Sequence, residues 1–189
     1  MPRPPILPTV DWRAVFASGL DHSAWLAAAE SPEQAQKMEA RREALTLPPG
    51  LAASLPALAR PVHVVAIAED WCGDVVRHVP ALQRMAEACP RLQVRFISRA
   101  QWPDVFVRFL TNGGEAIPKF IFLSESFVEC GSWGPMPESC RVLIARGKAC
   151  GDVAAARIKV KALYEADPGQ GEVFSELARL VDIAACREP

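Results

Sequence analysis

Closely spaced cysteine pairs are missing from this chain, although it has six cysteines in 189 residues. No two of them are separated by only two to four residues, the spacing that zinc fingers and zinc ribbons use. The three histidines, His22, His63 and His78, also lie far from one another in the sequence. We therefore expect no metal site, and nothing in the pattern calls for a cofactor.

Long apolar runs are missing too. No segment reaches the roughly 18 consecutive apolar residues that a membrane-spanning helix needs. Prolines interrupt the first eight residues, where a secretion signal requires a continuous apolar stretch. We therefore expect a cytoplasmic protein without a membrane segment, in which the cysteines stay mostly reduced.

An excess of charge of one sign is also missing. The formal net charge is −1 and both signs are mixed along the chain. Such a pattern does not indicate a surface for nucleic acid, and we expect no nucleic-acid partner. Half of the residues are apolar, which is enough for a packed core, and the length suits one domain with additions.

What the chain does contain is a cysteine between a strand pattern and a helix pattern. Residues 62–67 form an apolar β-type run, and residues 73–89 repeat apolar side chains with the period of a helix. Cys72 is therefore expected at the helix N-terminus, where unpaired N–H groups and the helix dipole favour a thiolate. Asp74 opposes this effect because it carries a like charge. Arg77 and His78, predicted on the helix surface, are further sources of positive potential.

Three features around Cys72 resemble those of a known family. Trp71 precedes the cysteine, Pro80 follows it by eight residues, and Ile117-Pro118 opens a later β-type run. In these features the chain resembles the thioredoxin-like superfamily, in which Trp-Cys-x-x-Cys lies on a strand-to-helix turn. More narrowly, it is similar to a bacterial group with a Cys-Gly-Asp-Cys motif and a helical N-terminal extension. The resemblance implies that Ile117 and Pro118 face the cysteine and bind substrate, with Pro118 in the cis form.

The resemblance also implies a role for each residue of the motif. Cys72 matches the thiolate that attacks a disulfide, and Trp71, Gly73 and Asp74 shape the site around it. Val75 stands where the family has its second cysteine, so it cannot resolve a mixed disulfide. We therefore expect a thiol-disulfide oxidoreductase of monothiol type, which forms mixed disulfides with protein or glutathione partners. An external thiol or a distant cysteine of this chain would release them.

A second hypothesis stays open because a retired redox site would also lose its second cysteine. In that case the chain is a thioredoxin-fold binding module without turnover, which holds a partner in the Pro118 groove or on the N-terminal helices. Peroxide reduction fits less well, since Glu69-Asp70-Trp71 does not match the residues that usually precede a peroxidase cysteine. Cys89, Cys130, Cys140 and Cys150 are expected to be buried packing residues.

The order of the predicted elements indicates an α/β fold. After residue 60 the order is strand, helix, strand, helix, hairpin and helix, as in a thioredoxin core, and a right-handed crossover makes the first two strands parallel. We predict a thioredoxin-like fold, a central mixed sheet flanked by helices. Residues 1–59 are predicted as a helical N-terminal extension packed on the core, 60–165 as the thioredoxin-like domain, and 166–189 as a C-terminal helix of the same domain.

Some predicted helices are long. Residues 11–30 read as one helix that Gly19 is able to interrupt, and Ser31-Pro32-Glu33-Gln34 is typical of the start of a second helix. A single helix is predicted from Pro137 to about Tyr164, and a last one over about 172–185.

The predicted core lacks an obvious counterpart of the first strand that the thioredoxin-like family has.

Overall fold

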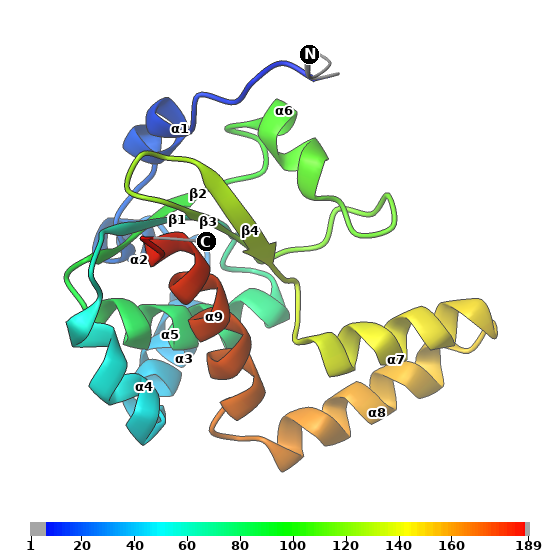
Figure 1. Cartoon of the computed structure of the whole chain (residues 1–189). Coiled ribbons are helices and arrows are strands. Elements are labelled where there is room, and N and C mark those ends of the chain that lie inside the picture. Colours follow the sequence, from blue (N-terminus) through cyan, green and yellow to red (C-terminus); the bar gives the residue numbers. More distant parts are fainter. Residues whose placement is uncertain (1–6, 188–189) are drawn as a thin grey trace.

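A four-stranded sheet lies at the centre of the computed structural model, which describes residues 7–187 (Figure 1). The strand order is β2-β1-β3-β4, and the bounds are β1 Val62–Ile67, β2 Leu92–Ile97, β3 Lys119–Leu123 and β4 Glu129–Trp133. Strands β1 and β2 are parallel, whereas β3 pairs antiparallel with both β1 and β4. The predicted mixed sheet is confirmed.

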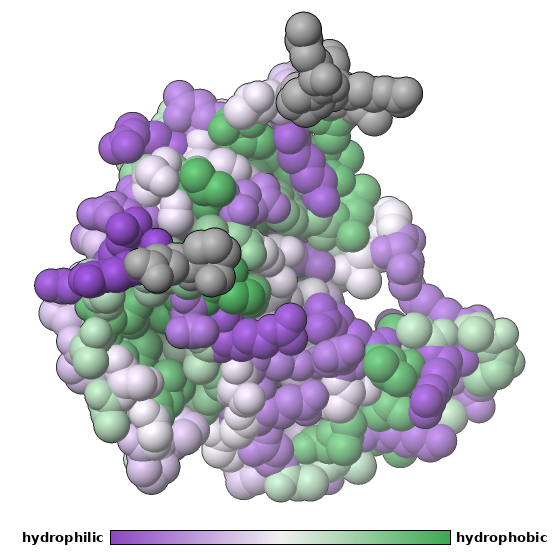
Figure 2. Space-filling view, viewed as in Figure 1, coloured by the Kyte–Doolittle hydropathy of each residue, from purple (hydrophilic) through white to green (hydrophobic). Residues whose placement is uncertain are grey.

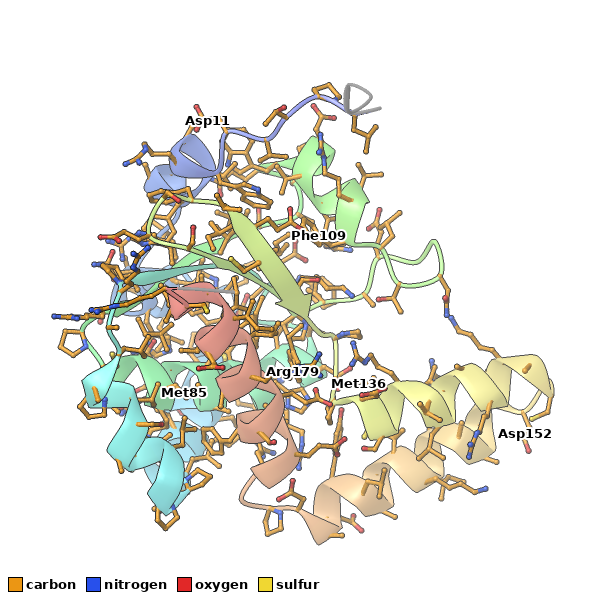
Figure 3. The ribbon with its side chains drawn as sticks, in the orientation of Figure 1. Asp11, Met85, Phe109, Met136, Asp152 and Arg179 are labelled. Atoms are coloured by element: carbon orange, nitrogen blue, oxygen red, sulfur yellow. The ribbon has the colours of Figure 1, made fainter. Side chains whose placement is uncertain are left out.

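Helices cover both faces of this sheet. All six residues of β1 are buried, as expected for a central strand with an uninterrupted apolar run. Helices α5 (Gly73–Ala88) and α9 (Gly171–Ala185) pack on one face, and α1 (Trp12–Ser18), α6 (Pro103–Phe106) and the 3₁₀ turn Val107–Phe109 lie on the other. Figure 3 labels Phe109 and Met85 on these opposite sides. In the described residues, no helix has the length and apolarity required to cross a membrane.

The N-terminal region contains two short helices where one was predicted. Helix α1 ends at Ser18 and α2 spans His22–Ala27, with an extended link between them. In this link, Leu20 exchanges backbone hydrogen bonds of 2.8 and 2.9 Å with Phe96 of β2. A Cβ on Gly19 would lie 2.8 Å from the Cβ of Arg95, so the close approach requires glycine. A single paired residue thus stands at the sheet edge in place of a strand.

The rest of the N-terminal region packs behind α5. Helix α3 (Pro32–Ala44) begins as predicted, because Ser31 accepts a hydrogen bond from the Gln34 N–H, and it lies against α5. Helix α4 (Pro49–Ser54) and the 3₁₀ turn Leu55–Ala57 follow. Met38 and Leu55 are buried in the same core as the sheet residues.

A helical hairpin extends from the body between β4 and α9 (Figure 1). It consists of α7 (Glu138–Ala149) and α8 (Val153–Ala166), and we call it the arm. The prediction of one continuous helix here was wrong. Gly151 has a φ of +77°, and the Asp152 carboxylate caps α8 by accepting from the Ala155 N–H, so the chain reverses at this point. Figure 3 labels Met136 at the base of the arm and Asp152 at its tip.

Candidate functional site

Cys72 lies at the N-cap of α5, where β1 has ended and the helix begins. It is a half-buried thiol, and its side chain does not cap the helix. The sulfur lies 3.5 Å from the backbone carbonyl oxygen of Ile117, a residue 45 positions further along the chain. The Ile117–Pro118 peptide bond is cis. The structure therefore brings together the cysteine and the two later residues that the sequence pattern singled out.

The neighbours of Cys72 divide into an open side and a closed side. Trp71 is 52% exposed, and Gly73 has open space where a Cβ would stand. Val75, by contrast, is 0% exposed and belongs to the hydrophobic core. A partner can approach Cys72 from the side of Trp71 and Gly73, whereas Val75, where the resemblance would place a second cysteine, faces the interior.

Arg99 is a residue of the site that the sequence reasoning missed. Its guanidinium forms two 3.1 Å hydrogen bonds with the Glu69 carboxylate, pairs with Glu115 at 2.7 Å, and lies 5.3 Å from the ring centre of Trp71. The hydrogen bond to Glu69 raises the pKa of Arg99 most, and the charges of Glu69, Glu115 and Cys72 add to the rise. Arg99 is therefore a positive charge that a Cys72 thiolate would feel.

A sequence signal for Arg99 did exist. Glu69 and Arg99 each follow the end of a strand by two residues, β1 in one case and β2 in the other. Because these strands are parallel, their carboxyl ends meet at one edge of the sheet, and side chains just beyond them come together. Opposite charges at equivalent positions after the two strands indicate the ion pair.

Beneath the motif, a chain of hydrogen bonds runs from Asp74 to Gln170, and we call it the Asp74–Gln170 chain. The Tyr164 hydroxyl donates to Oδ1 of Asp74 at 3.1 Å and lies 3.1 Å from Nε2 of His78. Nδ1 of His78 lies 3.0 Å from Oε1 of Gln170, whose Nε2 donates to the Arg77 carbonyl at 2.9 Å. The motif residue Asp74 is thereby linked to the base of the arm and to the start of α9.

Burial controls the ionisation of this chain. It raises the pKa of Asp74, while the hydrogen bond from Tyr164 and the charge of Arg77 act in the opposite direction. Burial also raises the pKa of Tyr164, and it lowers the pKa of His78 to about 3. His78 is consequently neutral at pH 7.

The prediction that His78 lies on the helix surface was wrong, since its exposure is 0%. The residue shares the inner face of α5 with Val75 and Val79, and both of its ring nitrogens have partners in the Asp74–Gln170 chain. Arg77 is also engaged, because it donates to the Tyr164 carbonyl at 2.8 Å and lies over the Tyr164 ring at 4.0 Å. His63 is packed as expected, stacked on Phe127.

Other groups that could assist Cys72 are few. Cys89 and Cys140 are buried, and burial raises the pKa of the Cys140 thiol. Of these two buried thiols, Cys140 is the one that interacts electrostatically with Asp74, a residue of the Cys72 motif. Within residues 7–187, no group of three or more His, Cys, Asp or Glu side chains could hold a metal ion. The site is therefore a single thiol framed by backbone and by Arg99.

Comparisons with known proteins place this chain in a family. A family model described as Thioredoxin matches residues 19–157. Two solved structures share the fold: PA1234 of Pseudomonas aeruginosa, a protein of unknown function (TM-score 0.72, 20% identity), and an HIV epitope-scaffold (0.68, 18%). Each alignment covers 92% of this chain and 98% of the other. A comparison with curated proteins found no significant match. Because the family match spans well over half of the chain and contains Cys72 and Pro118, the chain belongs to the thioredoxin family.

Proposed function

We propose that this protein is a thiol-disulfide oxidoreductase of monothiol type that acts in the cytoplasm through Cys72. One observation carries the proposal: the Cys72 sulfur lies at the N-terminus of α5, 3.5 Å from the Ile117 carbonyl and beside the exposed Trp71. Helix N-termini carry unpaired N–H groups, and reactive cysteines recur at such positions. Membership in the narrower bacterial group with a Trp-Cys-Gly-Asp motif is part of this proposal.

The chemistry has two steps, and each is a thiol-disulfide exchange. In the first, the Cys72 thiolate attacks one sulfur of a substrate disulfide, a new S–S bond forms, and the other substrate sulfur leaves as a thiolate that takes up a proton. In the second, the thiolate of an external thiol such as glutathione attacks the mixed disulfide and releases Cys72 as a thiolate. The external thiol supplies one sulfur to the new disulfide, so electrons and atoms balance.

The Ile117–Pro118 segment supplies the place for a substrate backbone. Residues 115–118 lie outside the strands, and Ile117 directs its carbonyl at Cys72. An extended substrate chain can pair with such a segment in the manner of an added strand, which sets its disulfide beside the thiol. Substrates are then protein disulfides or mixed disulfides with glutathione.

A binding module without turnover is the second candidate function. The observation that favours it is Val75, because a buried valine cannot resolve a mixed disulfide. Under this hypothesis the Pro118 groove holds a partner, and Cys72 is a packing residue. The two functions differ in one respect that can be measured directly, the reaction of Cys72 with a disulfide.

The test is reaction with glutathione disulfide, followed by peptide mapping. We expect the adduct on Cys72, its removal by added reduced glutathione, and no adduct at this position in Cys72→Ser. Cys150, which is exposed, is the internal control for non-specific exchange. If Cys72 forms no adduct while Cys150 does, the redox proposal is wrong and the binding module is the better account.

A further inference from the structure

A cleft lies between the arm and the loop formed by residues 111–116, which precedes Ile117. Its volume is about 730 Å³, within the range of ligand sites in proteins. Figure 1 shows the loop facing the arm, and Figure 2 shows the molecule hollowed between them. The apolar side chains that line it come from the arm and its base: Met136, Val142, Ile144, Ala145, Val153 and Val160.

The cleft adjoins the site of Cys72 along the chain. Ala116 lines it and directly precedes Ile117, whose carbonyl touches the sulfur. The two walls are also fixed to each other, because the buried Lys119 ammonium donates to the Thr111 hydroxyl at 2.6 Å and to the Gly134 carbonyl at 3.1 Å. A substrate chain bound at Ile117 would therefore extend into a cleft whose two sides are joined by the hydrogen bonds of Lys119.

The charges in the cleft are unbalanced. Arg141, Lys148 and Arg157 line it, and within the described residues their side chains have no ion-pair or hydrogen-bond partner. Of the two carboxylates in the lining, Glu115 is already paired with Arg99, which leaves Glu138.

Lys119 adds to the positive potential beneath the cleft. Burial and the Arg141 charge lower its pKa to about 8, so it is still mostly charged at pH 7. The positive charges of the cleft are complementary to acidic side chains, and its apolar lining is complementary to apolar side chains of the same partner.

We propose that this cleft binds an acidic, partly apolar segment of the protein whose disulfide Cys72 attacks. The inference rests on the proposed function and names its substrate class. A small anion would leave the apolar lining of α7 and α8 uncovered, whereas a peptide with alternating acidic and aliphatic residues meets both kinds of surface. The arm thus selects the substrate while Cys72 performs the exchange.

The experiment uses three synthetic peptides that differ only in the residues flanking one cysteine: Asp and Leu, Asn and Leu, or Lys and Leu. Each cysteine carries thionitrobenzoate in a mixed disulfide, and the release of thionitrobenzoate by the wild type, less the release by Cys72→Ser, gives the rate of attack by Cys72. At low salt we expect the acidic peptide to react roughly tenfold faster than the lysine peptide, a typical size for electrostatic steering. The difference should shrink as salt is added.

Matched variants assign the effect to the cleft. The double variant Arg141→Gln/Arg157→Gln should lose most of the preference for the acidic peptide. The control Arg146→Gln/Lys159→Gln makes the same charge change on the same two helices outside the cleft lining, and it should keep the preference. If both variants lose the preference for the acidic peptide equally, the preference comes from the overall positive charge of the arm, and the proposal of a binding site in the cleft is wrong.

A parallel measurement separates this inference from the proposed function. Fluorescent versions of the peptides with serine in place of cysteine report binding alone. The difference between the wild type and Cys72→Ser in the reaction with 5,5′-dithiobis(2-nitrobenzoate) reports the reactivity of Cys72 without a peptide. Tight binding of the acidic peptide to the wild type, weakened by Arg141→Gln/Arg157→Gln, supports the cleft even if Cys72 is unreactive. A reactive Cys72 with no discrimination among the three peptides overturns the cleft and leaves the redox function standing.

Discussion

At the scale of single residues, Cys72 and Val75 lie three positions apart and differ in their surroundings. Cys72 is half-buried at the N-cap, while Val75 is 0% exposed and packs in the core at the first turn of α5. Residues 72 and 75 therefore have the spacing of a dithiol motif, but only residue 72 carries a thiol. A single substitution at residue 75 would place a second thiol at this spacing.

Val75→Cys should restore an internal resolving thiol. We expect the variant to form a disulfide with Cys72 under mild oxidation and to reduce insulin disulfides with dithiothreitol faster than the wild type. The cost is small, since a cysteine fills most of the space of a valine and is itself suited to burial. Thiol counting under denaturing conditions checks the disulfide, and Cys140→Ser in the same background excludes pairing with the buried thiol of α7. An unchanged thiol count after oxidation would contradict the proposed geometry.

Arg99 acts on Cys72 through its charge. Removing a positive charge close to a thiolate disfavours the thiolate, so Arg99→Gln should slow the alkylation of Cys72 at pH 7 by roughly two- to fivefold at low ionic strength. Added salt should reduce this difference.

The control for Arg99 is Arg60→Gln, which removes an exposed arginine at the other end of β1. It should leave the rate unchanged. Equal rates for Arg99→Gln and the wild type at low salt would remove Arg99 from the site.

At the scale of elements, the arm depends on one close helix contact. A Cβ on Gly147 of α7 would lie 2.5 Å from the Cβ of Ala156 and 2.9 Å from the Asp152 carbonyl oxygen. Both neighbours are parts of the turn and of α8, so neither can move without separating the two helices. The arm is therefore packed at its tip by glycine and anchored at its base by Tyr164.

Gly147→Ala should separate α7 from α8. We expect a loss of about 1–3 kcal/mol in the free energy of unfolding, the usual cost of overpacking. Hydrogen exchange should show faster opening of residues 138–166 than of the sheet.

Gly50→Ala is the matched helical control, because nothing lies within 4 Å of its Cβ position. It should be neutral or stabilise the fold by up to about 1 kcal/mol. Similar destabilisation by both substitutions would contradict the packing described for the arm.

At the scale of the whole molecule, the Asp74–Gln170 chain connects the active-site helix with the arm and with α9. Its pH dependence follows from the sign of the His78 shift. The pKa of His78 is about 3 in the folded protein and about 6.5 in the unfolded chain, so between these values the unfolded chain binds the extra proton. Stability must then fall as the pH is lowered through this window. Asp74, whose pKa is raised, contributes with the opposite sign.

His78→Gln isolates the histidine contribution. The wild type should lose stability on acidification from pH 6.5 to pH 4 more steeply than the variant, with a difference in slope of at most about 1.4 kcal/mol per pH unit. Denaturant unfolding at several pH values measures both slopes. The slope is the informative quantity, because lost hydrogen bonds lower the stability of the variant at every pH. Parallel slopes would show that His78 is not held neutral by the fold.

The sequence predicted the central part of this molecule well and the additions poorly. The strands and α5 follow from local apolar patterns. The motif around Cys72, together with Ile117–Pro118, indicated the thioredoxin-like fold. The break at Gly151 was missed because the helix signal continues on both sides of it, although Gly151 followed by Asp152 is a local signal for the end of one helix and the start of the next. Local pattern could not reveal that His78 is buried, since its partners lie 86 and 92 residues away.

The reactivity of Cys72 is tested by the rate of its alkylation by iodoacetamide at pH 7, compared by peptide mapping with Cys150 in the same molecule. Cys150 is the more exposed of the two, so accessibility alone would make it react faster. We predict that Cys72 reacts several-fold faster, since reactive cysteines recur at helix N-termini near a basic side chain. A rate for Cys72 equal to or below that of Cys150 would contradict it.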